Sequence, residues 1–380
     1  MIYADHNATT PPLPEVIAAM AAIMAEGWGN AGSRQHVRGR SAGAAVDAAR
    51  IEIATLINAK PGEIIFTSGA TESCNLALFG LGERLLATRP RIVTCATEHA
   101  AVAEAVRRLG EAGADVVVLG VDRDGRLDPA QLAAAVNERT GIVALMMVNN
   151  ETGVIHDVAA AATIAHRHGA LLVCDGTQGV GKLPVDVTQL GVDALAFTAH
   201  KMYGPQGCGA LWLRRGLGCS PQLVGGSQER GLRGGTLNLP GIVGFGVAAA
   251  HARRDLAARR TYLATLGTLF ESRIRELLPE VVIQGEHAPR IPGTSMCTIP
   301  GLPHGWLATL STVAASGGST CSSGHGSPIL RAMGCDDHDA SNSIRIGLGI
   351  HTTADQVEAI AQELTRGVVA LRKQVNAGAG

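Results

Sequence analysis

Two residues in this sequence could do chemistry together, because each follows a run that is typical of a buried strand. Lys201 comes shortly after the apolar run 193–197, with Thr198 and His200 in between and a Gly-Pro turn behind it. Lysine is rarely buried without a partner, so a lysine that ends a core strand is a candidate for a Schiff base with an aldehyde. A lysine at a strand end also often leans into solvent, and the position alone leaves both interpretations open.

Asp175 supplies the second half of the pattern. It ends the apolar run 171–175 and lies 26 positions before Lys201, about one strand-helix-strand unit away. In a parallel sheet both residues would sit at the carboxyl ends of strands, where open α/β sheets bind ligands. A Schiff-base lysine and a carboxylate that keeps a pyridine nitrogen protonated are what pyridoxal phosphate requires. Taken alone, Asp175 would serve equally well as a helix N-cap before residues 176–178.

Three further segments place polar groups after predicted strands. The turn 66–73 offers backbone N–H groups and the Thr71 hydroxyl at a helix N-terminus, which suits a phosphate, although an ordinary N-cap turn has the same composition. His99 follows another apolar run and could stack on a flat ring, move protons or be structural. Asn150, in the segment 149–153, could orient a cofactor hydroxyl or a substrate carboxylate, or belong to a plain turn.

The last part of the chain adds a thiol and a guanidinium. Cys321 lies near the centre of the Gly/Ser-rich loop 316–328, where a thiol can reach a substrate and then swing away; an incidental cysteine in a linker is the alternative. Arg345 lies among apolar residues, where its fork suits a carboxylate substrate or an internal salt bridge. The loop 225–236 is suited to a phosphate or a partner subunit, or is a surface loop.

The elements that would position these residues alternate between strands and helices. Helical patterns, such as 100–111 and 129–137, lie between several short apolar runs, and this alternation predicts a mostly parallel sheet covered by helices on both faces. A long helix over 256–278 would bridge to a smaller second domain that starts near residue 280. The apolar runs are 64–66, 92–95, 116–119, 142–148, 171–174, 194–197 and 210–213.

The composition suits a globular protein and excludes several classes. Of the 380 residues, 46% are hydrophobic and 17% are charged, and a net charge of -1 offers no nucleic-acid surface and no polybasic membrane patch. No apolar run reaches the length of a membrane span and no secretory signal is visible, so we expect a cytoplasmic protein. None of the eight cysteines forms a Cys-x-x-Cys pair, which predicts free thiols and no metal site.

In their order and spacing, these motifs resemble the cysteine desulfurases of the NifS/IscS type, a class V branch of fold-type I pyridoxal-phosphate enzymes. The resemblance implies an α/β fold in which a large cofactor-binding domain (12–255) contains a mostly parallel seven-stranded sheet. A smaller α+β domain (1–11 and 256–380) would carry the Cys321 loop. The resemblance runs from residue 5 to Arg345 and rests mainly on 67–73, 149–153, His200-Lys201, 233–236 and the Cys321 loop.

The resemblance further implies a homodimer that removes sulfur from L-cysteine. Lys201 would hold pyridoxal phosphate as a Schiff base and move protons, and Cys321 would attack the substrate sulfur, giving alanine and a persulfide. Asn150 and Arg345 would hold the cysteine carboxylate. The other cofactor contacts that it implies are His99 stacked on the ring, Asp175 at the pyridine nitrogen, Gln178 at the ring oxygen, and Ala70, Thr71, Thr198, His200 and the other subunit's Thr236 around the phosphate.

Some features depart from the family pattern. Cys74 stands where the family usually shows Asp or Asn, and the loop reads Gly-Gly-Ser-Thr before Cys321 where relatives often have Ser-Gly-Ser-Ala. The chain stops soon after its final helical pattern, whereas longer relatives have a tail that docks an iron-sulfur scaffold protein. The sulfur acceptor protein therefore stays open among iron-sulfur assembly, tRNA thiolation and DNA phosphorothioation. Selenocysteine lyase, an aminotransferase or epimerase, and a non-catalytic sulfur carrier are the alternative functions.

Overall fold

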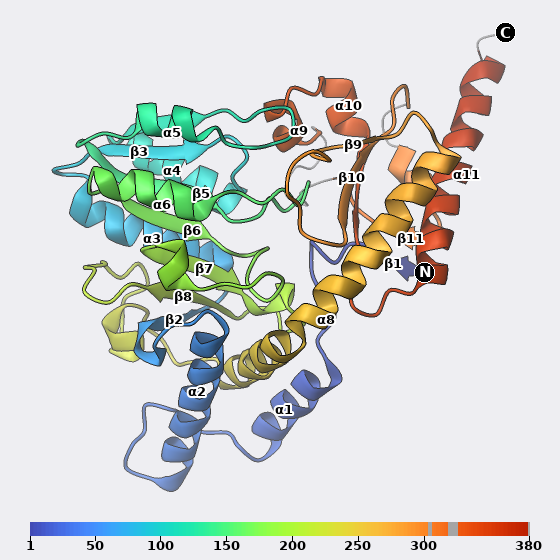
Figure 1. Cartoon of the computed structure of the whole chain (residues 1–380). Coiled ribbons are helices and arrows are strands. Elements are labelled where there is room, and N and C mark those ends of the chain that lie inside the picture. The colour runs from blue at the N-terminus through green and yellow to red at the C-terminus, as the bar shows by residue number, and fades with distance from the viewer. Residues whose placement is uncertain (303–305, 318–325, 379–380) are drawn as a thin grey trace.

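The computed structural model describes residues 1–302, 306–317 and 326–378, and its largest element is a seven-stranded sheet (Figure 1). The strands are β2 (Ile64–Thr67), β3 (Arg91–Cys95), β4 (Asp115–Leu119), β5 (Thr140–Met146), β6 (Leu171–Asp175), β7 (Ala194–Thr198) and β8 (Gly209–Leu213), in the order β2-β8-β7-β6-β5-β3-β4. The five strands from β7 to β4 pair in parallel, whereas β8 runs antiparallel to both of its neighbours. The predicted mostly parallel seven-stranded sheet is confirmed.

Helices connect these strands and cover the sheet on both faces. The predicted helix over 100–111 is present with those bounds, and the one predicted over 129–137 ends at Ala135. The helices are α1 (Pro14–Ala25), α2 (Val37–Leu56), α3 (Ala70–Leu85), α4 (Ala100–Glu111), α5 (Pro129–Ala135), α6 (Val158–Arg167) and α7 (Val187–Leu190), with 3-10 turns η1 (Pro61–Glu63), η2 (Ala199–Lys201) and η3 (Gln228–Gly231).

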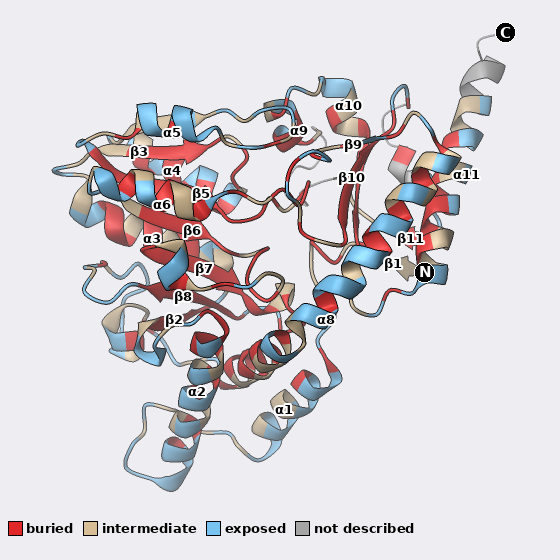
Figure 2. Ribbon diagram, viewed as in Figure 1, coloured by how far each residue is buried: buried red, intermediate tan, exposed pale blue. Residues whose placement is uncertain are grey.

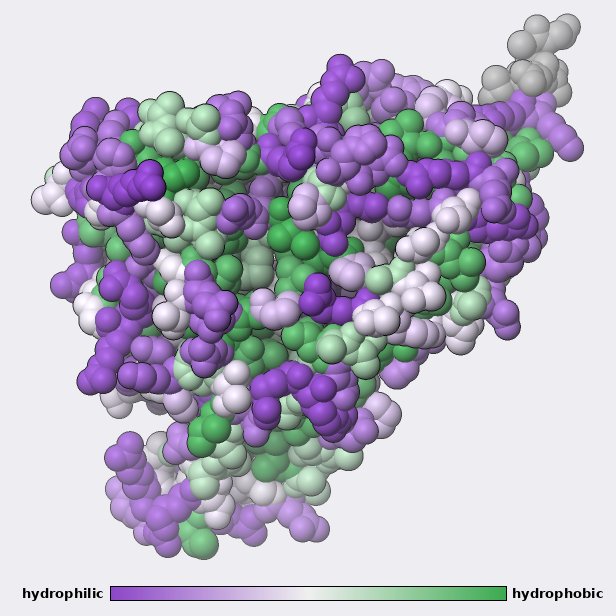
Figure 3. Space-filling model, in the orientation of Figure 1, coloured by the Kyte–Doolittle hydropathy of each residue, from purple (hydrophilic) through white to green (hydrophobic). Residues whose placement is uncertain are grey.

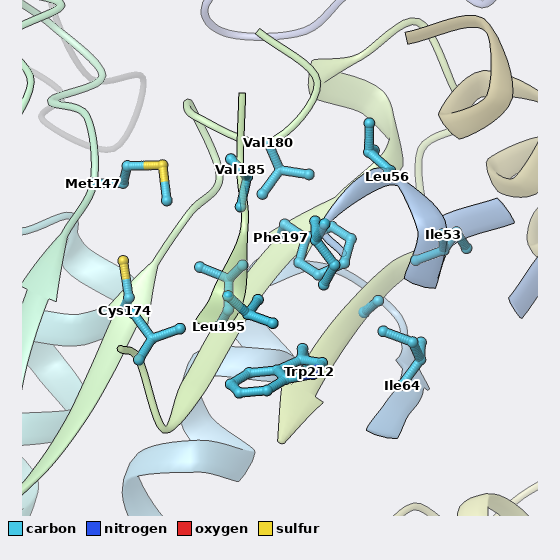
Figure 4. Close-up of a cluster of buried hydrophobic side chains, with 14 of the residues drawn as sticks. Ile53, Leu56, Ile64, Met147, Cys174, Val180, Val185, Leu195, Phe197 and Trp212 are labelled. Carbon is cyan, nitrogen blue, oxygen red and sulfur yellow. The ribbon is translucent and has the colours of Figure 1, made fainter. Parts of the chain in front are cut away.

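Side chains of the sheet alternate between two buried faces. In β5, Val143 and Leu145 join one apolar cluster while Ile142 and Ala144 join the other, as the two-residue period of a strand requires. Helices α2, α5 and α6 pack on the first face, and α3 and α4 pack on the second. Figure 2 shows the strands buried between helices whose outer faces are exposed, and Figure 4 shows the first cluster around Phe197. The sheet is thus held rigidly on both sides.

A second group of elements lies beside the sheet. It contains a three-stranded antiparallel sheet in the order β12-β10-β9 and the parallel pair β1-β11, so that the first strand of the chain lies against a late one. A separate apolar cluster, which includes Phe270 and Trp306, fills this part. The division into two domains at residue 255 stays a prediction. The elements are β1 (Ile2–Tyr3), β9 (Val282–Ile283), β10 (Thr294–Thr298), η4 (Trp306–Thr309), β11 (Val313–Ala314), α9 (Pro328–Ala332), α10 (Asp337–Asn342), β12 (Ser343–Gly347) and α11 (Ala354–Gly378).

A single long helix, α8 (Leu239–Leu277), links the two apolar clusters. The prediction that this helix starts at residue 256 was wrong, because it begins at Leu239. Its first turns are rich in glycine, which disfavours helix by propensity, but packing overrides that preference. A Cβ at Gly246 would lie 2.6 Å from the Cα of Ala49 in α2, so glycine lets the two helices approach closely. With 39 residues, α8 is about 58 Å long and runs diagonally across Figure 1.

The surface is mixed in character. Figure 3 shows hydrophilic side chains over the margins of one face and hydrophobic side chains gathered toward its middle. Within the described part of the chain, no helix combines the length and the hydropathy that crossing a bilayer requires.

Candidate active site

A cavity of about 530 Å³ lies where the carboxyl ends of the parallel strands meet the N-termini of α3 and α4. This is the edge of an open α/β sheet at which ligands bind. Thr236 is exposed and is not part of the lining, and Cys321 lies outside the described residues. The predicted site residues that line the cavity are Ala70, Thr71, His99, Asn150, Asp175, Gln178, Thr198, His200, Lys201 and Arg345.

Lys201 is held by the first residues of the chain. It ends η2, directly after β7, and its Nζ donates to the carbonyl oxygens of Asn7 at 2.5 Å and Ala8 at 2.6 Å. The segment that bears these carbonyls is itself fixed, because the N–H and the hydroxyl of Thr10 both donate to the His200 carbonyl at 2.9 Å. Sequence reasoning gave no role to Asn7 and Ala8, since only the folded chain brings them to the lysine. Carbonyl oxygens at this distance orient the Lys201 amine, and they bring no negative charge to it.

Asp175 and His99 stand at neighbouring strand ends. The Asp175 side chain is only 5% exposed, and its Oδ1 accepts the N–H of Thr177 at 2.9 Å, so the N-cap alternative is realised as a turn rather than as a helix cap. His99 caps α4, because its Nδ1 accepts the N–H of Ala101 at 3.1 Å. That bond leaves the proton of the neutral ring on Nε2. The site thus offers a buried carboxylate and an imidazole N–H in fixed positions.

The turn between β2 and α3 is built to receive an anion. No side chain caps α3, and the N–H groups of Ala70 and Thr71 donate to no acceptor among the described residues. Thr198 faces this turn, since a Cβ at Gly69 would lie 4.0 Å from its Oγ1. A Cβ at Gly209 would lie 2.6 Å from the Gly69 Cα, so the glycine in β8 lets the turn approach the sheet. Uncapped N–H groups at a helix N-terminus favour a phosphate.

Arg345 serves both of the roles that the sequence left open. Its side chain is 2% exposed, and its Nη2 pairs with Asp5 Oδ1 at 2.7 Å and donates to Ser316 Oγ at 2.9 Å. Its Nη1 donates to the Asn150 carbonyl at 3.0 Å. The internal salt bridge is therefore present, yet Arg345 also lines the cavity. Its Nε and the Asn150 Oδ1 are buried without a partner, and such atoms are available to a bound carboxylate or amine.

Burial shifts the pKa values of several ionisable groups in and beside the cavity. Burial, together with the charges of Lys201 and Lys182, lowers the pKa of His200 to about 4, so this ring is neutral at pH 7. Burial and the charges of Lys201 and Arg345 lower the pKa of Lys182 to about 7. Burial raises the pKa of Glu98 well above its usual range, which favours the protonated form of that carboxyl. The cations Lys201, Lys182 and Arg345 thus lie close enough to one another to act on each other's charge, and a negatively charged ligand would relieve that repulsion.

Known proteins are similar to this chain in sequence and in fold. Residues 2–360 match the family model for class-V aminotransferases. The cysteine desulfurase IscS of Anaeromyxobacter sp. (strain Fw109-5) is 42% identical over 379 residues, which cover 98% of this chain and 93% of that protein. The solved structure of a NifS-like protein has a TM-score of 0.90 and 32% identity, covering 97% of this chain and 100% of its own. The structure of SspA in complex with cysteine has a TM-score of 0.83 and 30% identity, with 93% and 100% covered.

Proposed function

The chain belongs to the class-V aminotransferase family, and on that premise we propose that it is a cysteine desulfurase that uses pyridoxal phosphate. It takes L-cysteine, releases L-alanine and leaves the sulfur as a persulfide on Cys321. The observation that carries the proposal is the convergence of Lys201, Asp175 and the uncapped N-terminus of α3 on one cavity.

The residues present fit pyridoxal phosphate group by group. An amine for the aldehyde, a buried carboxylate for the pyridine nitrogen and bare helix N–H groups for the phosphate all line the same cavity. We propose that Ala70, Thr71, Thr198 and His200 hold the phosphate, that Asp175 pairs with the ring nitrogen, that His99 stacks on the ring and that Gln178 contacts its oxygen. When bound, the cofactor supplies an electron sink for the bonds at the substrate's α-carbon.

The chain's own residues bind and orient the substrate. We assign the cysteine carboxylate to Arg345, whose buried Nε–H has no partner, and to the N–H groups of the Asn150 amide, while the unpartnered Asn150 Oδ1 can accept from the substrate amine. SspA, which is similar over nearly its whole length, has been solved with cysteine bound, and that structure supports cysteine as the substrate here. The Asn7 and Ala8 carbonyls keep the Lys201 amine facing the cavity, where it can take a proton from the α-carbon and return one to the product.

Sulfur transfer needs a second nucleophile, and we assign it to Cys321. The thiolate attacks the substrate sulfur: an S–S bond forms on Cys321 and the substrate's C–S bond breaks. The carbon keeps the electron pair and takes a proton, which gives alanine. The persulfide then passes its outer sulfur to an acceptor protein, because a persulfide is a reversible form of cysteine. Thr236, which is exposed and outside the cavity, would complete the phosphate site of a second copy in a homodimer.

The test measures alanine and sulfide released from L-cysteine in the presence of a thiol reductant. Wild type, Lys201→Ala and Cys321→Ser are compared, with Cys335→Ser as a matched cysteine control outside the cavity. We expect the wild type and the control to be active and the other two variants to release neither product. Full turnover by Cys321→Ser would rule out the persulfide step, and a wild-type protein that binds no pyridoxal phosphate would rule out the proposal as a whole.

A further inference from the structure

Lys182 is a second lysine at the edge of the site, and the proposed mechanism does not use it. Only four of the chain's 32 cationic side chains are lysines, and two of the four, Lys182 and Lys201, meet here. The other two, Lys60 and Lys373, are exposed. Most cationic side chains of the chain are arginines, but the one beside Lys201 is a lysine. A lysine offers a compact ammonium group with three donors on one atom. The scarcity of lysine is the signal in the sequence that could have drawn attention to Lys182.

A tight, glycine-rich turn brings Lys182 beneath Gln178. After β6 the chain doubles back, with the N–H of Val180 donating to the Gly176 carbonyl at 2.8 Å and the N–H of Lys182 to the Gly179 carbonyl at 3.0 Å. Gly181 has a φ of 80°, a left-handed conformation that favours glycine, and a Cβ there would lie 2.8 Å from the Cβ of Met202. The turn places Lys182 Nζ at 2.5 Å from Gln178 Oε1.

The Gln178 amide is thereby held in one orientation. Its Oε1 accepts from Lys182, and its Nε2 donates to the Asn7 carbonyl at 2.9 Å. A protonated Lys182 can only donate and the Asn7 carbonyl can only accept, so a flipped amide would lose both bonds. Gln178 is 2% exposed and lines the cavity. Its Nε2 carries a second hydrogen that meets no acceptor among the described residues, and the cavity is where that N–H can be used.

The charges around Lys182 favour an electron-rich oxygen at this point. Nζ forms no ion pair with a carboxylate in the described part of the chain, and the charged groups that act on it are the cations Lys201 and Arg345. When Lys182 is protonated, the Gln178 N–H that its ammonium polarises is a stronger donor than an isolated amide, since chains of hydrogen bonds reinforce one another. The acceptor that suits it is an anionic or strongly polarised oxygen.

We infer that Lys182 is a positioning residue, which holds the Gln178 amide so that its second N–H meets the 3-oxygen of pyridoxal phosphate. The inference rests on the proposed function. In the proposed site, Asp175 pairs with the pyridine nitrogen and the N-terminus of α3 binds the phosphate. The 3-oxygen is then the polar ring substituent that still needs a hydrogen-bond partner. Lys182 acts through Gln178 and makes no contact of its own with the ligand.

The experiment compares two ligands and needs no turnover. Protein freed of cofactor is titrated with pyridoxal 5'-phosphate and with 3-deoxypyridoxal 5'-phosphate, which lacks the 3-oxygen. The proteins are wild type, Lys182→Met, Gln178→Leu, the double variant, and Lys373→Met as the control for loss of a lysine. We expect Lys182→Met to raise the Kd for pyridoxal phosphate about tenfold, the scale of one hydrogen bond to a charged group, and to change the Kd for the deoxy ligand less than twofold.

The double variant provides the second criterion. Because Lys182 acts through Gln178, removing it from the Gln178→Leu protein should have no further effect on the Kd for pyridoxal phosphate. Equal losses for the two ligands, or an additive loss in the double variant, would overturn the inference. If Lys182→Met does not fold, Lys182→Gln takes its place with the same selective loss expected. Failure of the wild type to bind pyridoxal phosphate would instead refute the proposed function, so the two failures are distinguishable.

Discussion

The close approach of Gly209 to Gly69 predicts that one added methyl group, in Gly209→Ala, will open the phosphate turn. The new Cβ would lie 2.6 Å from both the Cα and the carbonyl carbon of Gly69, and neither backbone atom can rotate away. Reaching an ordinary contact of about 3.4 Å moves the turn by about 0.8 Å. Hydrogen bonds near 2.9 Å from the N-terminus of α3 would lengthen to about 3.7 Å, which is no longer a hydrogen bond.

Two consequences have measurable sizes. Overpacking of this kind costs about 1–3 kcal/mol of folding free energy, and loss of one bond to a charged phosphate costs about 1.5 kcal/mol, or roughly tenfold in affinity. Affinity is measured with pyridoxal 5'-phosphate and with pyridoxal, which has no phosphate. Gly120→Ala is the matched control, because a Cβ there meets nothing within 4 Å. We expect Gly209→Ala to lose affinity for the phosphate ester alone. Wild-type affinity for both ligands would refute the reasoning.

Three further outcomes follow from buried ionisable groups. Burial lowers the pKa of His6, His156 and His200 to about 4, whereas the pKa in the unfolded chain is about 6.5. Between these two values the folded state binds fewer protons than the unfolded state. The urea concentration at the unfolding midpoint should therefore fall as the pH drops from 6.5 to 4. His156→Leu should flatten that fall, and an unchanged slope would contradict it. Burial raises the pKa of Glu98 well above its usual range, which favours an uncharged carboxyl that an amide can replace. Glu98→Gln should therefore change the free energy of unfolding by less than about 1 kcal/mol in thermal unfolding. A loss above twice that would show that the charged carboxylate is needed. Arg345→Lys should raise the KM for L-cysteine at least tenfold with a smaller change in kcat, because lysine cannot reproduce the guanidinium fork; an unaltered KM would place the substrate carboxylate elsewhere.

Much of the large sheet could be predicted because its signal is local. Each apolar run that the sequence analysis picked out became a strand, and alternation with helical patterns implied parallel pairing. Lys201 and Asp175 could be placed at one edge of the sheet for the same reason, since parallel strands end together. The spacing of these two residues was therefore enough to bring them into one cavity.

The remaining features depend on contacts that no local pattern records. The carbonyls that hold Lys201 come from Asn7 and Ala8, almost two hundred residues earlier, and Lys182 reaches Gln178 only through the turn at Gly181. The start of α8 was misplaced because glycine weakens helix propensity, while its reason for being there is the neighbouring helix α2. In each case a contact between segments that are distant in the sequence, or the packing of a neighbouring helix, decides the structure.

The pairing of β1 with β11 sets an order for assembly during synthesis. Every residue of the two clusters that flank the large sheet, except Ile291, has been made by Ala252, and so has the lysine. The strand that seats the first residues is made some sixty positions later, when Val313 can pair with Ile2. Since domains fold as units from the N-terminal side, the large sheet with its two flanking clusters can form while the peptide is still growing. Residues 7–10 can already be held on this part by Thr10 and Gln178, so it is the first strand, β1, that gains its partner only when β11 is made.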